Sequence, residues 1–290
     1  MLRIDAHHHL WRYNATEYGW LEGELAVLRR DFIVDDLKQA MRQAGVSGTV
    51  AVQARQALEE TSWLLELAAA NPFLLGVVGW LPLRDPKFSE LLEQHREQQA
   101  LKGLRHVVQG EAPGFLDDSA FNAGIEAMQG TGLVYDILIF ERQLEEATRF
   151  VDRHPNQIFV LDHIAKPKIK AGELQPWADK IAEFAKRENV FCKISGMVTE
   201  ADPKQWTSVQ LKVYFDTVLE SFTPARLLVG SDWPVICAGC SYERWWTLLG
   251  EWISPLSFHE QADILGRAAI RIYRLQEPTF LAQEDTRVTI

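Results

Sequence analysis

Three histidines stand together near the start of the chain, in the segment IDAHHH at residues 4–9. In an extended strand alternate side chains share a face, so His7 and His9 would point one way and His8 the other. Two imidazoles on one face can grip a single metal ion or polarise a single substrate group. The spacing taken alone is a weak signal, because it also arises by chance and in core packing.

A second segment, LLVGSDWP at residues 227–234, is an apolar run that ends abruptly in a carboxylate. A buried parallel strand has this pattern when its last residue emerges into a site. Asp232 would then stand at the end of one strand as His7 and His9 stand at the end of another. We therefore predict that these strand ends form one active site.

The elements that must position these residues recur along the chain. Eight short apolar or β-branched runs are each followed by a stretch with helical periodicity, which predicts a single-domain (β/α)₈ TIM-type barrel over residues 1–275, with 276–290 as a C-terminal tail. The alternative is an open doubly wound sheet, but that fold needs a glycine-rich phosphate-binding turn where HHHLW stands. The predicted strands are residues 2–9, 48–54, 74–80, 102–108, 133–139, 157–163, 189–195 and 226–232.

In a (β/α)₈ barrel the chemistry takes place where the strands finish, at the C-terminal mouth. These positions are rich in imidazole and charge, although His163 alone also fits a buried core histidine and Lys193 alone also fits a pair with a neighbouring carboxylate. The predicted mouth residues are His7, His9, Gln53, Trp80, Arg105, His106, Tyr135, Asp136, His163, Lys193, Ser195 and Asp232.

The composition of the chain limits the kinds of molecule that the protein can bind. With 290 residues, 47% of them hydrophobic, the chain can bury a large core. The formal net charge of −10 argues against a nucleic-acid surface, which needs clustered cations, and no apolar stretch is long enough for a membrane span. The start of the chain lacks the pattern of a signal peptide, so we expect a cytoplasmic protein that acts on a small molecule. A homo-oligomer stays open.

The three cysteines form no disulfide framework, which agrees with a reducing compartment. Cys237 and Cys240 have CxxC spacing but no second ligand pair, so we interpret them as incidental loop cysteines rather than a zinc site. The segment HEQAD at 259–263 lacks the final histidine of a metalloprotease motif. Ser257 followed by Glu260 instead predicts a capping box that begins a helix.

Five segments, in order and suitably spaced, resemble the lactonase branch of the amidohydrolase superfamily. They are DAHHHLW at 5–11, KGLRH at 102–106, LDHIAKP at 161–167, CKISG at 192–196 and GSDWPV at 230–235. The resemblance spans nearly all of residues 1–275 and is closest to sugar lactonases of the L-fuconolactonase and L-rhamnonolactonase type. It implies a distorted barrel in which His7, His9, His163 and Asp232 form the catalytic centre, and hydrolysis of an aldonolactone. This reaction needs a base for water, and we assign that role to Asp232.

The sequence departs from the two-metal members of that superfamily. Those use a bridging carboxylated lysine or glutamate and a histidine after strand five, whereas here strand four offers Arg105 and His106 and strand five offers Tyr135 and Asp136. A single divalent ion held by His7, His9 and Asp232, with His163 nearby, is the natural alternative, and zinc suits this nitrogen-rich set. Whether a metal is needed stays open, since some relatives in this branch work without one.

Further mouth residues suit a sugar ring. Cationic and imidazole groups donate hydrogen bonds to hydroxyls, and indole faces pack against a sugar ring or a C6 methyl group, which points to a 6-deoxy-sugar lactone. The predicted substrate-binding residues are Arg105, His106, Trp11, Trp80, Tyr135, Lys193 and Trp233. Two alternatives remain: an amidohydrolase-type decarboxylase of a small aromatic acid, whose opening motif typically carries an acidic residue, and a non-catalytic sugar-binding barrel.

Overall fold

The computed structural model describes residues 1–278, so most of the predicted tail, residues 279–290, lies outside the described part of the chain. Within residues 1–278, eight parallel strands pair in chain order. The first and last strands meet through a bridge between His8 and Trp233, and the Asp232 N–H donates to the His7 carbonyl. This architecture confirms the predicted (β/α)₈ fold. The strands are β1 (Ile4–His8), β2 (Gly48–Val52), β3 (Leu74–Gly79), β4 (Leu101–His106), β5 (Val134–Ile137), β6 (Phe159–Leu161), β7 (Val190–Ile194) and β8 (Leu227–Val229).

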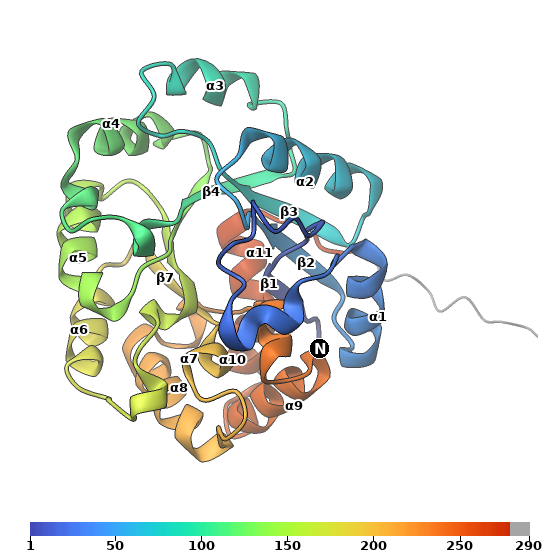
Figure 1. Ribbon diagram of the computed structural model, residues 1–290. Coiled ribbons are helices and arrows are strands. Elements are labelled where there is room, and N and C mark those ends of the chain that lie inside the picture. Colours follow the sequence, from blue (N-terminus) through green and yellow to red (C-terminus); the bar gives the residue numbers. More distant parts are fainter. Residues whose placement is uncertain (279–290) are drawn as a thin grey trace, which may run out of the picture.

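Helices surround the strands, and Figure 1 shows them as an outer ring with α11 at its centre. None of the described helices is long and apolar enough to cross a membrane. The capping box predicted at Ser257 and Glu260 is confirmed at the start of α10. The helices are α1 (Val34–Ala44), α2 (Leu58–Ala70), α3 (Phe88–Gln94), α4 (Ser119–Met128), α5 (Leu144–Arg153), α6 (Trp177–Phe184), α7 (Met197–Glu200), α8 (Ser208–Phe222), α9 (Tyr242–Ile253), α10 (Phe258–Ala262) and α11 (Ala268–Tyr273).

The part of the barrel interior below the C-terminal mouth is a packed apolar layer that α11 closes. Apolar side chains from the strands, most of them small or β-branched, meet Ala268, Ala269 and Tyr273 of this helix. Such a layer is the usual filling of this fold, whose interior is a core rather than a pore. It provides a rigid floor under the mouth. The strand residues in it are Ile4, Ala6, Val50, Val52, Val78, Val134, Val160, Phe191 and Leu228.

All eight strands end one to three residues earlier than the sequence predicts, and at β6 and β8 this changes how a site residue is presented. β6 stops at Leu161 and β8 at Val229, so His163 and Asp232 lie in the loops just beyond their strands. Both have positive φ, 52° for His163 and 59° for Asp232, and this left-handed backbone cannot continue a strand. The two residues therefore reach the mouth from turns rather than from strand ends.

Glu60, in the first turn of α2, organises the loop that leaves β2 at the mouth. Its side chain is buried, and Oε2 accepts hydrogen bonds from the backbone N–H groups of Ala54, at 3.1 Å, and Arg55, at 2.6 Å. Burial raises the pKa of Glu60 to about 7, although the Arg55 contacts oppose the shift. The carboxyl group is therefore partly protonated near neutral pH in the folded protein.

This pKa predicts a pH-dependent stability. The folded protein holds the Glu60 proton more tightly than the unfolded chain does. The protonated carboxyl group therefore contributes fully to the free energy of unfolding below about pH 4.5, and this contribution is lost as the pH rises through about 7. Glu60→Gln does not titrate. We expect the free energy of unfolding of E60Q, relative to wild type, to rise by roughly 3 kcal/mol between pH 4.5 and 8. Urea unfolding across this range measures it, with the exposed neighbour substitution E59Q as control. A difference that does not vary with pH contradicts the prediction.

Candidate active site

Three metal-ligand-type atoms from the two ends of the chain meet at the mouth. The Nε2 atoms of His7 and His9 lie 3.3 Å apart. Asp232 Oδ1 lies 3.3 Å from His9 Nε2 and 3.8 Å from His7 Nε2. The side chains of His9 and Asp232 keep 7% and 8% exposure, whereas His7 has none. His7 is thus the floor of the site, and His9 and Asp232 form its accessible edge.

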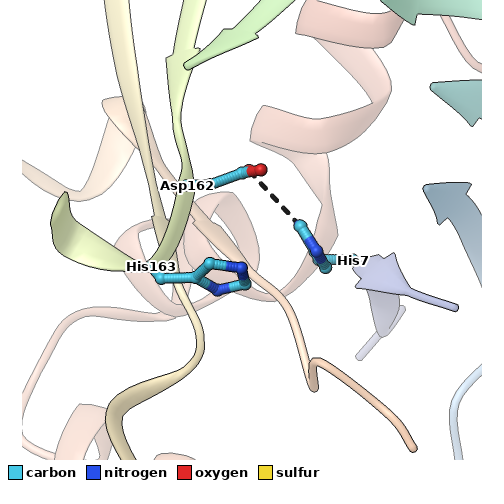
Figure 2. Close-up of side chains that lie close together, drawn as sticks. All are labelled: His7, Asp162 and His163. Carbon is cyan, nitrogen blue, oxygen red and sulfur yellow. Dashed lines mark ion pairs between the residues drawn. The ribbon is translucent and has the colours of Figure 1, made fainter. Parts of the chain in front are cut away.

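His163 completes the imidazole set from the opposite wall. Its ring centroid is 4.5 Å from that of His7, and its Nδ1 lies 2.8 Å from Ser195 Oγ. Figure 2 shows the rings of His163 and His7 close together, with Asp162 above them and joined to His7 by an ion pair. The four residues that the sequence places in the catalytic centre therefore come together in space.

A left-handed turn presents His163. The four residues from His163 to Lys166 all have positive φ, which is rare for residues other than glycine and costs about 1–2 kcal/mol each. Trp177 holds the turn by donating from Nε1 to the Ile164 carbonyl at 2.8 Å. Gly196, after β7, passes directly under the ring: a Cβ there would lie 2.8 Å from three atoms of His163. The absence of a side chain at Gly196 is what leaves room for His163.

We expect Gly196→Ala to lower kcat about tenfold or more, because the added methyl group must displace His163 from its working position. Gly172→Ala is the matched control, since Gly172 has φ +69°, close to the +68° of Gly196, and nothing lies within 4 Å of its Cβ position. Both substitutions should cost about 1–2 kcal/mol of backbone strain. Steady-state kinetics and thermal unfolding separate the two effects. Equal kcat values for G196A and G172A would show that His163 does not need this position.

Asp5 fixes the geometry of β1 against the turn that carries Asp232. Its carboxylate accepts from Ser231 N at 2.8 Å, Ser231 Oγ at 2.6 Å and Tyr242 OH at 2.9 Å. It is fully buried and accepts from the His7 backbone N–H as well. One carboxylate thus holds the backbones next to His7 and Asp232 together. Sequence reasoning missed this role, although Asp5 lies within the motif at 5–11.

The site pairs neutral imidazoles with an ionised carboxylate. Burial acts to raise the pKa of Asp232, but His163, His9 and His7 more than offset it, so this pKa lies well below its usual value. Burial lowers the pKa of His163 to about 4 despite the nearby carboxylates, and burial also lowers the pKa of His7. At neutral pH the residues therefore offer one negative carboxylate next to the uncharged rings of His7 and His163.

Beneath His7 lies a buried layer of charged side chains. Arg105 NH1 contacts Asp162 Oδ2 at 2.9 Å, and Lys193 Nζ pairs with Asp136 and, at 3.1 Å, with Asp162 Oδ1. Neither Asp136 nor Asp162 was among the predicted catalytic, metal or substrate-binding residues. Strand alternation could have found them, because Asp136, Asp162 and Lys193 each follow an inward apolar residue by two positions. They are Val134, Val160 and Phe191.

The structure corrects three predicted substrate-binding residues. Lys193 lies below His7 with its contacts already made to Asp136, Asp162 and His7, so the alternative interpretation as a carboxylate partner is right. Tyr135 alternates with Asp136 and therefore points outward. Its ring packs against Phe121, Phe150 and Phe159. Trp11 is fully buried, and its N–H is used by the Arg30 carbonyl.

The other predicted contacts lie around the mouth. Trp80 and His106 are half-buried and joined by a hydrogen bond from Trp80 Nε1 to His106 Nδ1 at 3.3 Å. The remaining His106 nitrogen lies 2.8 Å from Glu111, and Phe115 stacks on one face of the ring at 4.8 Å, so the ring offers its other face rather than a free donor. Trp233 is almost buried and packs edge-on against Phe32. Arg105 is 3% exposed and donates to Asp162 and the Gln53 carbonyl.

The triangle of donor atoms fits one divalent ion. Tetrahedral zinc with bonds of about 2.0–2.1 Å separates its ligand atoms by about 3.3–3.4 Å, close to the 3.3, 3.3 and 3.8 Å found among His7, His9 and Asp232. His9 Nδ1 lies 2.8 Å from the Val52 carbonyl, so it carries the proton and leaves the Nε2 lone pair free. His7 reaches the same state when its proton is on Nδ1, where Asp162 Oδ1 lies 3.3 Å away.

Comparison with known proteins agrees with this geometry. A family model described as amidohydrolase matches residues 4–275. The chain belongs to the amidohydrolase family, as its motifs predicted. It is 39% identical to an L-fucono-1,5-lactonase of Burkholderia multivorans, over 96% of this chain and 97% of that protein. An L-rhamnono-gamma-lactonase of Scheffersomyces stipitis is 26% identical over 49% of this chain and 48% of its own.

A solved structure is similar over almost the whole chain. It is the crystal structure of an amidohydrolase from Burkholderia multivorans with bound zinc, which matches with a TM-score of 0.92 and 38% identity. The match covers 95% of this chain and 100% of that one. The fold of this chain and its membership of an enzyme family are therefore established.

Proposed function

We propose that the protein hydrolyses a sugar lactone to the free sugar acid. The observation that carries this proposal is the full-length identity of 39% to an L-fucono-1,5-lactonase. The site suits the reaction, because ester hydrolysis needs a base for water and donors for the oxyanion that develops on the carbonyl. Asp232 is the proposed base, with His7, His9 and His163 as the other catalytic groups.

The first half of the reaction adds water to the lactone carbonyl. Asp232 takes one proton from the water as its oxygen forms a bond to the carbonyl carbon, and the carbonyl electrons move onto the oxygen. The His163 ring, whose Nδ1 is occupied by Ser195 Oγ, can donate from Nε2 to this oxyanion at short range. Arg105, directly behind His7, adds positive potential.

The second half breaks the bond between the carbonyl carbon and the ring oxygen. The oxyanion electrons re-form the carbonyl, and the leaving ring oxygen takes the proton back from Asp232. Asp232 has a low pKa, so its carboxylate is a weak base but its protonated form is a strong acid. This acidity suits the return of the proton to the ring oxygen. The sum is one lactone plus one water giving one hydroxy acid.

A divalent ion, zinc by preference, fits between His7, His9 and Asp232, and would lower the pKa of bound water toward about 7 and polarise the carbonyl. With or without a bound ion, the protein itself orients the catalytic side chains. Val52 fixes the His9 ring through Nδ1, and Asp5 fixes the turn that carries Asp232. These contacts hold the site in shape before substrate arrives.

The proposed substrate is a five- or six-carbon aldonolactone, in particular a 6-deoxy-sugar lactone such as L-fuconolactone or L-rhamnonolactone. Trp80 and His106 form a partly exposed wall whose flat faces suit the apolar face of a sugar ring. One methyl contact is worth about 1–3 kcal/mol, so related lactones should be opened with graded efficiency.

A pH-indicator assay over a panel of D- and L-aldonolactones tests the proposal. Because these lactones open spontaneously in water, each rate is compared with an enzyme-free blank, with and without added Zn²⁺ or Mn²⁺. We expect L-fuconolactone and L-rhamnonolactone to open far faster than the blank. If no lactone does, the proposal is wrong. In that case, CO₂ release from hydroxybenzoic acids would favour a decarboxylase. Lactone binding without turnover would favour a sugar-binding barrel.

A further inference from the structure

The buried charges below the site are arranged around one ammonium group. Lys193 is fully buried on β7, and an ammonium has three N–H groups. Among the described residues, its Nζ lies next to three acceptor-type atoms. They are Asp136 Oδ2, Asp162 Oδ1 at 3.1 Å and His7 Nδ1 at 3.2 Å. One of the lysine's donors is therefore available to the catalytic ring.

Helix α11 holds this ammonium from below. The Tyr273 hydroxyl reaches up through the apolar layer and lies 2.8 and 2.9 Å from the two oxygens of Asp136. Asp136 in turn pairs with Lys193. Figure 1 shows α11 at the centre of the ring of helices, where it can contact residues inside the barrel. A helix near the end of the chain thus reaches the floor of the active site.

Two groups compete for the same nitrogen of His7. Lys193 meets hydrogen-bond geometry with Nδ1, whereas Asp162 Oδ1 approaches to 3.3 Å but makes no hydrogen bond within the described structure. When Lys193 donates to Nδ1, the single proton of the neutral ring lies on Nε2. That nitrogen is 3.3 Å from His9 Nε2, which is free to accept because His9 Nδ1 donates to Val52. Arg105 NH1 also meets hydrogen-bond geometry with His7 Nε2, but at 3.4 Å this contact is longer than the 3.2 Å contact of Lys193, and NH1 has a closer partner in Asp162 at 2.9 Å.

We propose that Lys193, anchored by Asp136 and Tyr273, is a positioning residue that places the His7 proton on Nε2, in a directed chain from Lys193 through His7 and His9 to the Val52 carbonyl. This chain orders the site without a metal. A metal ligand at His7 Nε2 needs the other arrangement, in which the proton lies on Nδ1 and Asp162 accepts it. Lys193 therefore opposes metal binding and Asp162 supports it. The role of His7 rests on the proposed function, but the proton position and the metal affinity do not.

The decisive variant is K193M/D136N, which removes one buried charge of each sign and so keeps the layer neutral. Its matched control is K212M/D216N, the same pair of substitutions at an exposed ion pair on α8. The ¹⁵N–¹H spectrum of histidine-labelled, metal-free protein reports which ring nitrogen carries the proton, with His7 assigned by its loss in His7→Gln. Zinc affinity is measured by competition with a chelator.

We expect His7 to carry its proton on Nε2 in wild type and in K212M/D216N, and on Nδ1 in K193M/D136N. The zinc Kd of K193M/D136N should fall about tenfold. An unchanged proton position together with an unchanged Kd overturns the proposal, as does a wild-type proton on Nδ1. If K193M/D136N fails to fold, Tyr273→Phe decides. We expect Y273F to increase the population of His7 with its proton on Nδ1, and to lower kcat three- to tenfold with KM within twofold. The control Tyr214→Phe on α8 should change neither the spectrum nor kcat. Equal spectra for Y273F and wild type overturn the proposal.

Discussion

Replacing Asp232 with asparagine is expected to lower kcat by a factor of 100 or more while the protein stays folded. Asparagine keeps the shape of the side chain but cannot accept a proton from water or return one to the ring oxygen. It also removes the charge that faces His9 at 3.3 Å. Because His9 and His163 have low exposure and keep their hydrogen bonds to Val52 and Ser195, the site should stay assembled.

The control for this variant is Asp216→Asn, which neutralises an exposed carboxylate on α8 that pairs with Lys212. Circular dichroism and thermal unfolding establish that both variants fold, and lactone hydrolysis above the blank gives kcat. D216N should keep wild-type turnover. If D232N does so as well, the base lies elsewhere, and His163 would be the next residue to test.

The barrel was predictable because each strand and helix carries its own local signal. The strands are short, continuous apolar or β-branched runs, and the stretches between them show period 3.6, so the order of elements follows from short-range patterns. That the four predicted catalytic residues come together in space was predictable to the same extent. His7, His9, His163 and Asp232 all belong to motifs that lie at or just beyond the C-terminal ends of strands, and that fold gathers those ends at one mouth.

The sequence did not show which of two neighbouring side chains points into the barrel. Tyr135 and Asp136 are neighbours at the end of β5, and only the inward direction of Asp136 takes it to Lys193. β1 adds an irregularity, since its pairing with β2 shifts between Asp5 and His8. Ala6 and His7 consequently both contact the barrel interior, although they are adjacent. Strict alternation would have placed them on opposite faces.

The left-handed backbone at His163 and Asp232 was also beyond the sequence patterns. No propensity predicts four successive non-glycine residues with positive φ, because each is unfavourable by itself. The surrounding structure holds them there, through the Trp177 hydrogen bond and the space that Gly196 leaves. Strain of this kind is typical of residues that a site must aim rather than merely pack.

Asp162→Asn is expected to cause a large loss of stability, about 3–5 kcal/mol, which corresponds to roughly 5–12 °C in Tm for a chain of this size. Asp162 is fully buried and faces Arg105 at 2.9 Å and Lys193 at 3.1 Å. Its neutralisation leaves two buried cations with Asp136 as the nearest compensating charge. Asp152→Asn is the control, since Asp152 is exposed and its two hydrogen bonds to Arg187 should be worth no more than about 1 kcal/mol.

The double variant D162N/K193M identifies the cause of that loss. If the unpaired buried charge is responsible, removal of the Lys193 ammonium leaves Arg105 and Asp136 as one positive and one negative group, and at least half of the lost stability should return. If instead the loss comes from distorted packing around residue 162, the second substitution adds its own cost, and the double variant is less stable than D162N. Urea unfolding of wild type, the two single variants and the double variant gives the coupling free energy directly. A coupling near zero would mean that the charged layer under His7 is not held by its mutual charge balance.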